Sequence, residues 1–394
     1  MKISSGTAVT GTLRYGMVGG GQGAFIGDVH RKGAAFDGHS MLVAGAFSRD
    51  YDNTLATGRL LRIETDRLYR SYEEMAEKEA AREDGIDYVV IVTPNNSHYA
   101  ISKAFLSRGI HVVCDKPLTI EADEAEELAA LAREKDLLFC VTYTNAGYPM
   151  VKQARELIAA GKLGEIRMVM AEYAQDWLAG LVEQQGDKMS WRTDPSQQGK
   201  STSVGDIGTH IENTVSYITG LEVESLCANL DVYGEGRKLD TNASILVKYA
   251  GGASGIYWCS QIAIGNDNAL RIRVFGSKGA LEWDSEDPNY LKVTYLGQPS
   301  QTISRGRDDL YPGAARFSRI PGGHPEGTYE AFANLYLAFA NALLIKKAGL
   351  APASGDLDFP SAEDGVKGVK FVDKCVESAG NGSAWVSFSS SGEQ

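Results

Sequence analysis

Three short motifs carry residue types that can hold a phosphate, stabilise negative charge or move a proton. A glycine-rich stretch occupies residues 19–24 (GGGQGA), Lys116 stands in the stretch 114–117 (CDKP), and His210 ends the stretch 205–210 (GDIGTH). A positioned lysine cation can stabilise an oxygen that develops negative charge. A neutral imidazole, whose unperturbed pKa is ~6.5, can accept a proton near neutral pH. The three motifs therefore define the candidate functional positions.

The glycine stretch fits the dinucleotide-binding fingerprint as Gly19-x-Gly21-x-x-Ala24, since it follows a strand-like run and precedes a helical pattern. Gly19 is expected to make the tight turn and Gly21 to let the backbone approach a pyrophosphate. The small side chain of Ala24 is expected to let the helix pack close to the strand. The free amides at the helix start would then face the phosphates. The competing interpretation is a plain glycine turn.

The tip of the next predicted strand bears on the choice of cofactor. An acid there would bind the ribose hydroxyls of NAD, whereas an arginine suits the 2′-phosphate of NADP. Ser48 stands where the acid is expected, and Arg49 and Asp50 follow it. This strand tip therefore leaves the choice between NAD and NADP open. Arg49 could equally stack under an adenine or be a solvated turn residue.

Asp206 and His210 are four residues apart, which on an α-helix places them on one face about a turn apart. Asp206 could then bind the same ligand or stabilise the imidazolium. Gly205 and Gly208 would let the backbone approach that ligand closely. The alternative is a helix-capping aspartate beside a buried, hydrogen-bonded histidine.

The first part of the chain has the pattern of a doubly wound α/β domain. Short apolar runs alternate with charged helical stretches, which predicts a parallel sheet with crossover helices. Ser71 and Glu74 form a capping box that should start a helix ending near residue 81. We expect a Rossmann domain over residues 12–147. Its strands are expected at 15–18, 41–47, 87–92, 111–114 and 137–143, and its further helices at about 24–36, 97–108 and 121–135.

The second part has a different pattern. Successive strand-like runs are joined by turn residues, and Gly251-Gly252 signals a hairpin. We expect an α+β domain over residues 148–394 with a large, mostly antiparallel open sheet, whose last helices could pack back on the first domain. Strands are expected at 166–173, 226–232, 243–249, 253–260, 270–275, 280–283 and 291–295, and helices at 151–160, 328–347 and 362–378.

The composition excludes several classes of protein. The chain has 394 residues, 43% of them hydrophobic, and a formal net charge of -12. An acidic surface disfavours nucleic acid and anionic membranes, because both are also negative. The five scattered cysteines and the lack of a signal segment predict reduced thiols and a cytoplasmic location. No histidine spacing suggests a zinc site, so no metal is expected.

These motifs, taken in order with Thr93-Pro94-Asn95 and His98, resemble the Gfo/Idh/MocA oxidoreductases. The resemblance spans the whole chain. The segments 148–150 (YPM), 191–195 (WRTDP) and 323–327 (GHPEG) look like the subgroup of scyllo-inositol and L-glucose dehydrogenases. One departure is Asp115, because the family usually has Glu-Lys-Pro at that motif. The shorter acid keeps the charge, so adjusted cofactor contacts are expected.

The resemblance implies an NAD(P)-dependent dehydrogenase that oxidises a ring hydroxyl of a cyclic polyol or sugar. His210 would remove the hydroxyl proton, Lys116 would stabilise the alkoxide, and hydride would pass to the nicotinamide, so that both side chains must reach one ring. The expected catalytic residues are Lys116, Asp206 and His210. The expected cofactor-binding residues are Gly19, Gly21, Gln22, Gly23, Ala24, Phe25, Ser48, Arg49, Thr93, Asn95, His98, Asp115 and Lys116.

A polyhydroxylated ring needs polar partners and an aromatic wall. Besides the three catalytic residues, the expected substrate-binding residues are Asn145, Tyr148, Trp191, Arg192 and His324, with Gln175 as a weaker candidate. Each also has a structural interpretation. Trp191 could be core, Arg192 could pair with Asp194, and His324 could cap the following helix.

Other functions remain open at this stage. One is oxidation at C3 of a glycoside, or a glycosidase that uses tightly held NAD. A non-catalytic sugar or nucleotide sensor is another, although relatives of that kind tend to lose the lysine or histidine that this chain retains. The expected partners are a small polyhydroxylated substrate and further copies of the chain, as a tetramer or dimer formed through the second sheet. The particular sugar and the direction of reaction are not determined.

Overall fold

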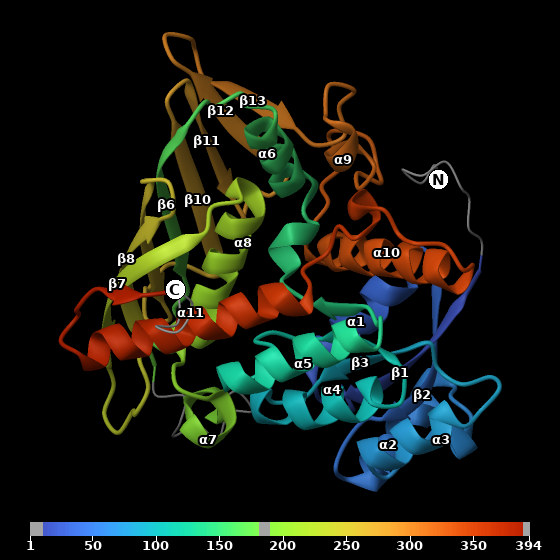
Figure 1. Cartoon of the computed structure of the whole chain (residues 1–394). Coiled ribbons are helices and arrows are strands. Elements are labelled where there is room, and N and C mark those ends of the chain that lie inside the picture. Colours follow the sequence, from blue (N-terminus) through green and yellow to red (C-terminus); the bar gives the residue numbers. More distant parts are fainter. Residues whose placement is uncertain (1–10, 181–189, 389–394) are drawn as a thin grey trace. The chain divides into compact units, whose positions relative to one another are not determined.

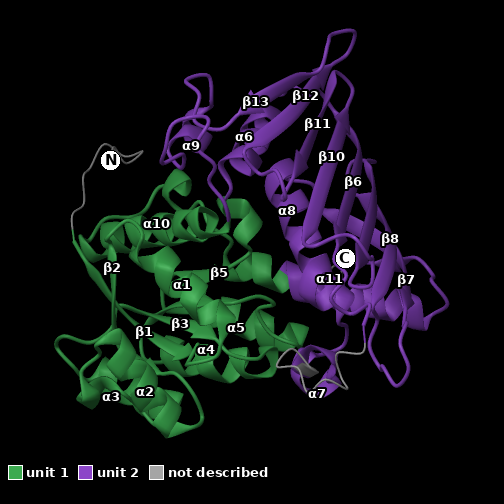
Figure 2. Ribbon diagram, turned by 180° about the vertical axis from the view of Figure 1, so that it is seen from behind, with its two compact units in different colours: residues 1–147, 328–366 green, residues 148–327, 367–394 purple. Residues whose placement is uncertain are grey.

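The computed structural model describes residues 11–180 and 190–388, which fold into two compact units (Figure 2). The first unit, drawn in green, comprises residues up to Gly147 together with Thr328–Val366. The second unit, drawn in purple, comprises Tyr148–Gly327 and the residues from Lys367 onward. Each unit has its own sheet and its own hydrophobic core.

The first unit is built on five parallel strands in the order β2-β1-β3-β4-β5. All five residues of β3 are buried, as expected for a parallel strand covered on both faces. The strand order reverses between β1 and β3, which is where open α/β sheets bind ligands. The predicted Rossmann-type sheet is confirmed. Its strands are β1 (Leu13–Gly19), β2 (Ser40–Ala46), β3 (Tyr88–Val92), β4 (His111–Cys114) and β5 (Phe139–Val141).

Helices surround this sheet (Figure 1). Helix α10 is apolar on all sides and correspondingly buried from Ala331 to Ala340. It packs on α1, where Phe332 and Tyr336 contact the ring of His30, and on the turn Thr144–Gly147. The helices are α1 (Phe25–Ala35), α2 (Tyr51–Leu61), α3 (Tyr72–Ala80), α4 (His98–Leu106), α5 (Ala122–Glu134) and α10 (Thr328–Lys347).

The start of α3 confirms half of the predicted capping box. The Ser71 hydroxyl accepts the backbone N–H of Glu74 at 3.2 Å. The Glu74 carboxylate, however, accepts the N–H of Arg70 at 3.0 Å and not that of Ser71. The reciprocal bond therefore falls one residue earlier than the motif predicts. The helix still begins and ends within a residue of expectation.

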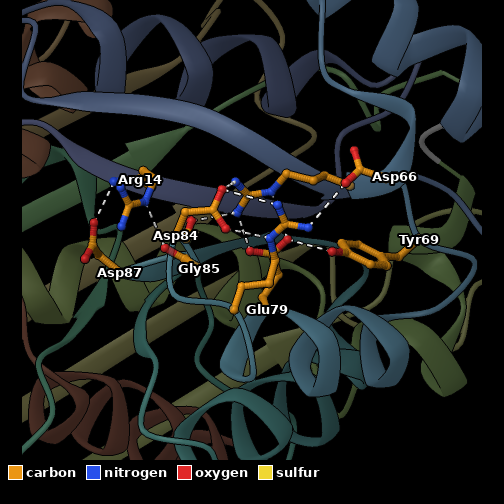
Figure 3. Close-up of polar contacts among 9 residues, drawn as sticks. Arg14, Asp66, Tyr69, Glu79, Asp84, Gly85 and Asp87 are labelled. Atoms are coloured by element: carbon orange, nitrogen blue, oxygen red, sulfur yellow. Dashed lines mark hydrogen bonds and ion pairs between the residues drawn. The ribbon is translucent and has the colours of Figure 1, made fainter.

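A cluster of charged side chains closes the amino-terminal edge of the first sheet (Figure 3). The backbone N–H of Arg14, the second residue of β1, donates at 2.6 Å to Asp87, which directly precedes β3. Nearby, the buried Arg67 guanidinium pairs with the buried Glu79 carboxylate, which also accepts the Tyr69 hydroxyl at 2.6 Å. These charges are mutually engaged and lie at the edge opposite the carboxyl ends of the strands. The cluster is therefore structural.

The second unit is built on a nine-stranded sheet in the order β13-β12-β11-β10-β6-β9-β8-β7-β14. Neighbouring strands are antiparallel except for β6 and β9, which run parallel. The predicted large, mostly antiparallel sheet is confirmed. Its strands are β6 (Ile166–Ala174), β7 (Val223–Asp231), β8 (Asn242–Tyr249), β9 (Ser254–Ser260), β10 (Ala269–Gly276), β11 (Gly279–Asp284), β12 (Tyr290–Tyr295), β13 (Gln301–Ser304) and β14 (Val386–Ser387).

Only one face of this sheet is covered within the unit. Burial alternates along β8, so that Ile245 and Val247 are buried while Leu246 is 45% exposed. The buried face packs against helices, with the Tyr257 ring 6.0 Å from that of Phe371. The predicted Gly251-Gly252 hairpin is present, and both residues have positive φ angles. The helices are α6 (Pro149–Ala159), α7 (Pro195–Gln198), α8 (Thr209–Thr219), α9 (Pro312–Ala315) and α11 (Ala362–Gly380).

Over residues 11–180 and 190–388, no helix has the length and apolarity that crossing a bilayer requires.

Candidate active site

The glycine loop leaves β1 at the point where the strand order reverses. Gly19 pairs with Val92 of β3 and has a φ of +82°, and a Cβ there would lie 2.6 Å from the Val92 carbonyl oxygen. Only glycine can make this turn without strain. The loop leads into α1, which has no side-chain cap. The first amides of that helix have no intrahelical partner and can face an anion.

One expected role in the glycine loop needs correction, and Gly21 has a further role. A Cβ on Gly21 would lie 2.6 Å from Asn53 Oδ1 and 3.0 Å from the Phe47 carbonyl, so Gly21 admits the neighbouring α2 segment into the loop. The expectation that Ala24 allows close packing of helix on strand is wrong, because Ala24 is the exposed N-cap of α1. Gly27 has that role, since a Cβ on it would lie 2.4 Å from the Gly20 Cα.

The remaining loop residues are open to solvent. Gln22, Gly23 and Ala24 are exposed, and Phe25 is 81% exposed. The backbone N–H of Gln22 donates to Asn53 and Thr57 of α2, each at 3.0 Å, so helix α2 holds the loop. The sequence reading did not predict α2 or its part in the loop.

The tip of β2 is also tied to α2. The Ser48 hydroxyl accepts the backbone N–H of Asp50 at 3.1 Å, and the Asp50 carboxylate caps α2 by accepting the N–H of Asp52 at 3.0 Å. Arg49 is exposed between them. The acid nearest to the strand tip, Asp50, is exposed but engaged in helix capping, and Arg49 is exposed beside it.

The loops that follow β3 and β4 lie next to each other at the carboxyl edge of the first sheet. Thr93 lies beside the glycine turn, because its Cγ2 is 2.8 Å from the position of a Cβ on Gly19. Asn95 is buried, and His98 is completely buried at the start of α4. The His98 ring contacts the carbonyls of Pro117 and Thr93, at 2.8 Å and 2.9 Å. A ring so enclosed lies behind the loops and not at their surface.

Lys116 is the second residue after β4, at the carboxyl edge of the sheet. Its backbone N–H donates to Asp115 Oδ1 at 2.8 Å, and the same oxygen accepts the Thr142 hydroxyl at 3.1 Å. The peptide bond between Lys116 and Pro117 is cis. Asp115, the departure from the family motif, therefore fixes the backbone of the lysine loop to the end of β5.

In the second unit, Asp206 lies in a π-helical segment, Val204–Gly208, that runs directly into α8. The expectation of regular α-helical spacing between Asp206 and His210 is therefore wrong, because a π turn is wider than an α turn. Such segments are often found at functional sites. The carboxylate of buried Asp240 accepts the backbone N–H groups of Thr202, Ser203 and Val204, at 3.0, 3.0 and 3.2 Å.

Asp240 thus acts as an anionic cap at the start of the segment that carries Asp206 and His210. Burial raises the pKa of the Asp240 carboxyl, although its hydrogen bonds oppose that shift. The segment also rests on β9, since the Ser203 hydroxyl donates to the Cys259 carbonyl at 3.2 Å. Sequence reasoning missed Asp240, because it lies more than thirty residues from the motif and is recognisable only by its position.

Asp206 and His210 share a polar neighbourhood. The Gln261 amide, 0% exposed, donates to Asp206 at 2.8 Å, and Arg192 approaches the other Asp206 oxygen at 3.8 Å. The ring of Tyr173 lies edge-on to the His210 ring, with 5.9 Å between centroids. Burial, and secondarily the charge of Asp206, raises the pKa of Tyr173, so this phenol stays protonated.

The other predicted substrate residues are distributed differently. Arg192 stacks on Trp191 at 4.5 Å, while Asp194 caps α7, so the alternative Arg192–Asp194 pairing is not what holds either residue. Gln175 donates to Asn268 at 2.6 Å, and Asn268 also accepts the Tyr173 hydroxyl at 2.7 Å, which adds Gln175 to the Asp206 neighbourhood.

The three remaining residues differ in burial, and Tyr148 is close enough to Tyr173 to contribute to the raised pKa of that phenol. Tyr148 is 7% exposed, and its ring packs against Trp283 at 5.4 Å. Asn145, in the first unit, is also 7% exposed. His324 is exposed on a loop whose backbone carbonyls bind the buried Arg305, which itself pairs with Glu326 at 2.7 Å.

Within residues 11–180 and 190–388, no three histidine, cysteine, aspartate or glutamate side chains gather in a way that could hold a metal ion.

A parallel sheet that carries a glycine loop and a lysine at the same carboxyl edge defines an NAD-binding oxidoreductase domain. Residues 13–143 match the model of the oxidoreductase family with an NAD-binding Rossmann fold. Residues 151–282 match the model of the GFO/IDH/MocA C-terminal domain. The chain belongs to the Gfo/Idh/MocA family of oxidoreductases.

Several relatives match over most of their length. The uncharacterized oxidoreductase YfiI of Bacillus subtilis is 37% identical, with 98% of this chain and all of that protein covered. The levoglucosan dehydrogenase of Pseudarthrobacter phenanthrenivorans is 28% identical, with 76% and 80% covered. An inositol dehydrogenase homolog from Azotobacter vinelandii is 39% identical. Its NAD+ complex has a TM-score of 0.93, with 98% and 100% covered, and its complex with NADH and myo-inositol has a TM-score of 0.89, with 96% and 98% covered.

Proposed function

We propose that this oxidoreductase oxidises a ring hydroxyl of a cyclic polyol or sugar, of the inositol or aldohexose type, by transferring hydride from the carbon that bears the hydroxyl to NAD+. The observation that carries the proposal is the Asp206–Gln261–Arg192 cluster beside His210, which offers charged and amide groups to a polyhydroxylated ring. The Azotobacter homolog bound to NADH and myo-inositol, and the levoglucosan dehydrogenase, support this class of substrate.

In the proposed reaction each residue has a distinct task. NAD+ bound at the glycine loop accepts the hydride when the C–H bond of the substrate breaks. His210 takes the hydroxyl proton, and Asp206 binds the same sugar or stabilises the resulting imidazolium. Lys116 stabilises the oxygen as it becomes negative. Arg192, Trp191, His324, Asn145 and Tyr148 are proposed as further substrate contacts.

The test is turnover of a substrate panel by the purified protein. We expect NADH to accumulate, with its near-ultraviolet absorbance, on one or more inositols or aldohexoses, and levoglucosan and a glycoside serve as comparison substrates. Parallel assays with NADP+ decide the role of Arg49. Glycoside conversion without net NADH would favour the glycosidase alternative instead.

Site variants test the assignment of roles. Lys116→Ala and His210→Ala are each expected to lower kcat by roughly a hundredfold or more. Lys116→Arg and His210→Gln serve as controls that keep size and polarity. Wild-type turnover by both alanine variants would contradict the assigned roles.

A further inference from the structure

The His98 side chain contacts the loops of two different strands in the first unit. Its Nδ1 lies 2.8 Å from the carbonyl oxygen of Pro117, in the loop after β4. Its Nε2 lies 2.9 Å from the carbonyl oxygen of Thr93, in the loop after β3. The imidazole therefore spans the two loops that follow neighbouring parallel strands.

The ring cannot bind a ligand directly, because His98 is 0% exposed. Its effect must pass through the two carbonyls. Buried carbonyls at strand ends need a donor, and a rigid ring that serves two of them fixes the separation of their loops. Both ring nitrogens lie within hydrogen-bond distance of a carbonyl, and a donor on either nitrogen serves the carbonyl that it faces.

The lysine loop is anchored on both of its flanks. On one side, Asp115 accepts the Thr142 hydroxyl at 3.1 Å, which ties the loop to the end of β5. On the other side, His98 ties Pro117 to the end of β3. Lys116 lies between these two anchors, and its own backbone N–H donates to Asp115. The lysine backbone is thus held between the strands on either side of it.

We propose that His98 is a positioning residue: its Nδ1 bond to Pro117 sets the place of Lys116, and its Nε2 bond to Thr93 sets the cofactor loop after β3. The inference rests on the proposed role of Lys116 in hydride transfer. It replaces the sequence expectation that His98 itself contacts the cofactor.

Two substitutions separate the two bonds. His98→Asn places an amide N–H near the position of Nδ1 and keeps the donor to Pro117. His98→Gln places one near Nε2 and keeps the donor to Thr93. We expect His98→Gln to lower kcat by roughly ten- to a hundredfold, since a small displacement of a reacting group has effects of that size. The KM for NAD+ should change little in this variant.

The expected result for His98→Asn is the reverse. Its kcat should stay within about threefold of wild type, while its KM for NAD+ rises about tenfold, because the loop after β3 loses its anchor. NADH binding followed by calorimetry should show the same loss without any turnover. Equal changes of kcat and KM in the two variants, or loss of folding in both, would overturn the positioning role.

A double-variant cycle separates failure of this inference from failure of the proposed function. If His98 acts through Lys116, His98→Gln should lower kcat no further in a Lys116→Ala background, because the two changes are then not additive. An additive effect on top of an impaired Lys116→Ala variant overturns the role of His98 alone. Full activity of Lys116→Ala itself overturns the proposed function of Lys116, whatever His98 does.

Discussion

The buried amide of Gln261 donates a 2.8 Å hydrogen bond to Asp206, which connects the residue following β9 to the GDIGTH motif. Hydrogen bonds to charged groups are worth about 1.5–3 kcal/mol. Gln261→Met, which keeps the shape and removes the donor, should therefore lower kcat/KM for the polyol by roughly ten- to a hundredfold. Steady-state kinetics with saturating NAD+ measure this, and unchanged kcat/KM would contradict the role given to Asp206.

Gln261→Glu tests the contact between Gln261 and Asp206 by replacing the donating amide with a second negative charge. A second carboxylate beside Asp206 disfavours ionisation of both groups and raises the pKa of the pair. The acidic limb of the pH–rate profile should consequently move to higher pH, a change that Gln261→Met should not produce. Coincident profiles for the two variants would contradict this interpretation.

Asp240 should contribute both to stability and to turnover. The Asp240 carboxylate accepts three backbone N–H groups, those of residues 202–204. An asparagine at this position keeps one accepting oxygen, but its amide N–H points toward at least one of these backbone N–H groups. We expect Asp240→Asn to lower the free energy of unfolding by about 1.5–3 kcal/mol and to lower kcat as the π-helical segment shifts. Urea denaturation and steady-state kinetics on the same sample measure the two effects.

Gly27→Ala tests the close contact of α1 with the glycine loop. The added methyl would lie 2.4 Å from the Gly20 Cα, and backbone cannot move away as a flexible side chain could. We expect a loss of about 1–3 kcal/mol in stability and weaker NADH binding. Gly380→Ala is the matched control, because nothing lies within 4 Å of its Cβ position. A Gly27→Ala protein as stable as this control would contradict the packing argument.

Stability should fall in mild acid because of His30, which is fully buried, and His111, which is partly buried. Burial lowers the pKa of His30 and of His111 to about 4, from 6.5. Between these values the unfolded chain binds protons that the folded chain does not, so the free energy of unfolding decreases as pH falls from about 6.5 to about 4. The full loss is up to roughly 3 kcal/mol for each histidine.

Denaturant titrations at several pH values measure this dependence. His30→Asn keeps an amide near Nδ1, which lies 2.8 Å from the Tyr336 hydroxyl, and removes the titrating group. Its stability should depend less steeply on pH over the same window. An unchanged slope would exclude His30 as a source of the acid sensitivity.

The local hydrophobic pattern was enough to predict both sheets. A strand buried on both faces gives an uninterrupted apolar run, and a strand buried on one face gives an alternation of apolar and polar residues. The bounds of β4 and α10 were predicted to the residue. The roles of Gly27, Asp240 and Gln261 could not be predicted, since each depends on a partner brought close only by the folded backbone. The π-helical geometry of residues 204–208 could not be predicted for a related reason. Its wider turn is held by contacts with Asp240 and β9, and not by its own sequence.

The parallel pairing of β6 with β9 has a consequence for where new contacts can arise. Two parallel neighbouring strands end at the same edge of the sheet. The residues that follow them, Gln175 and Gln261, therefore lie close together. The Gln175 N–H donates to the Ser260 carbonyl at 2.8 Å. A wholly antiparallel sheet would send these two exits to opposite ends. The parallel pairing of β6 and β9 thus gives the second unit one edge where two strands end side by side, as the strands of an open α/β sheet do at the edge that binds ligands.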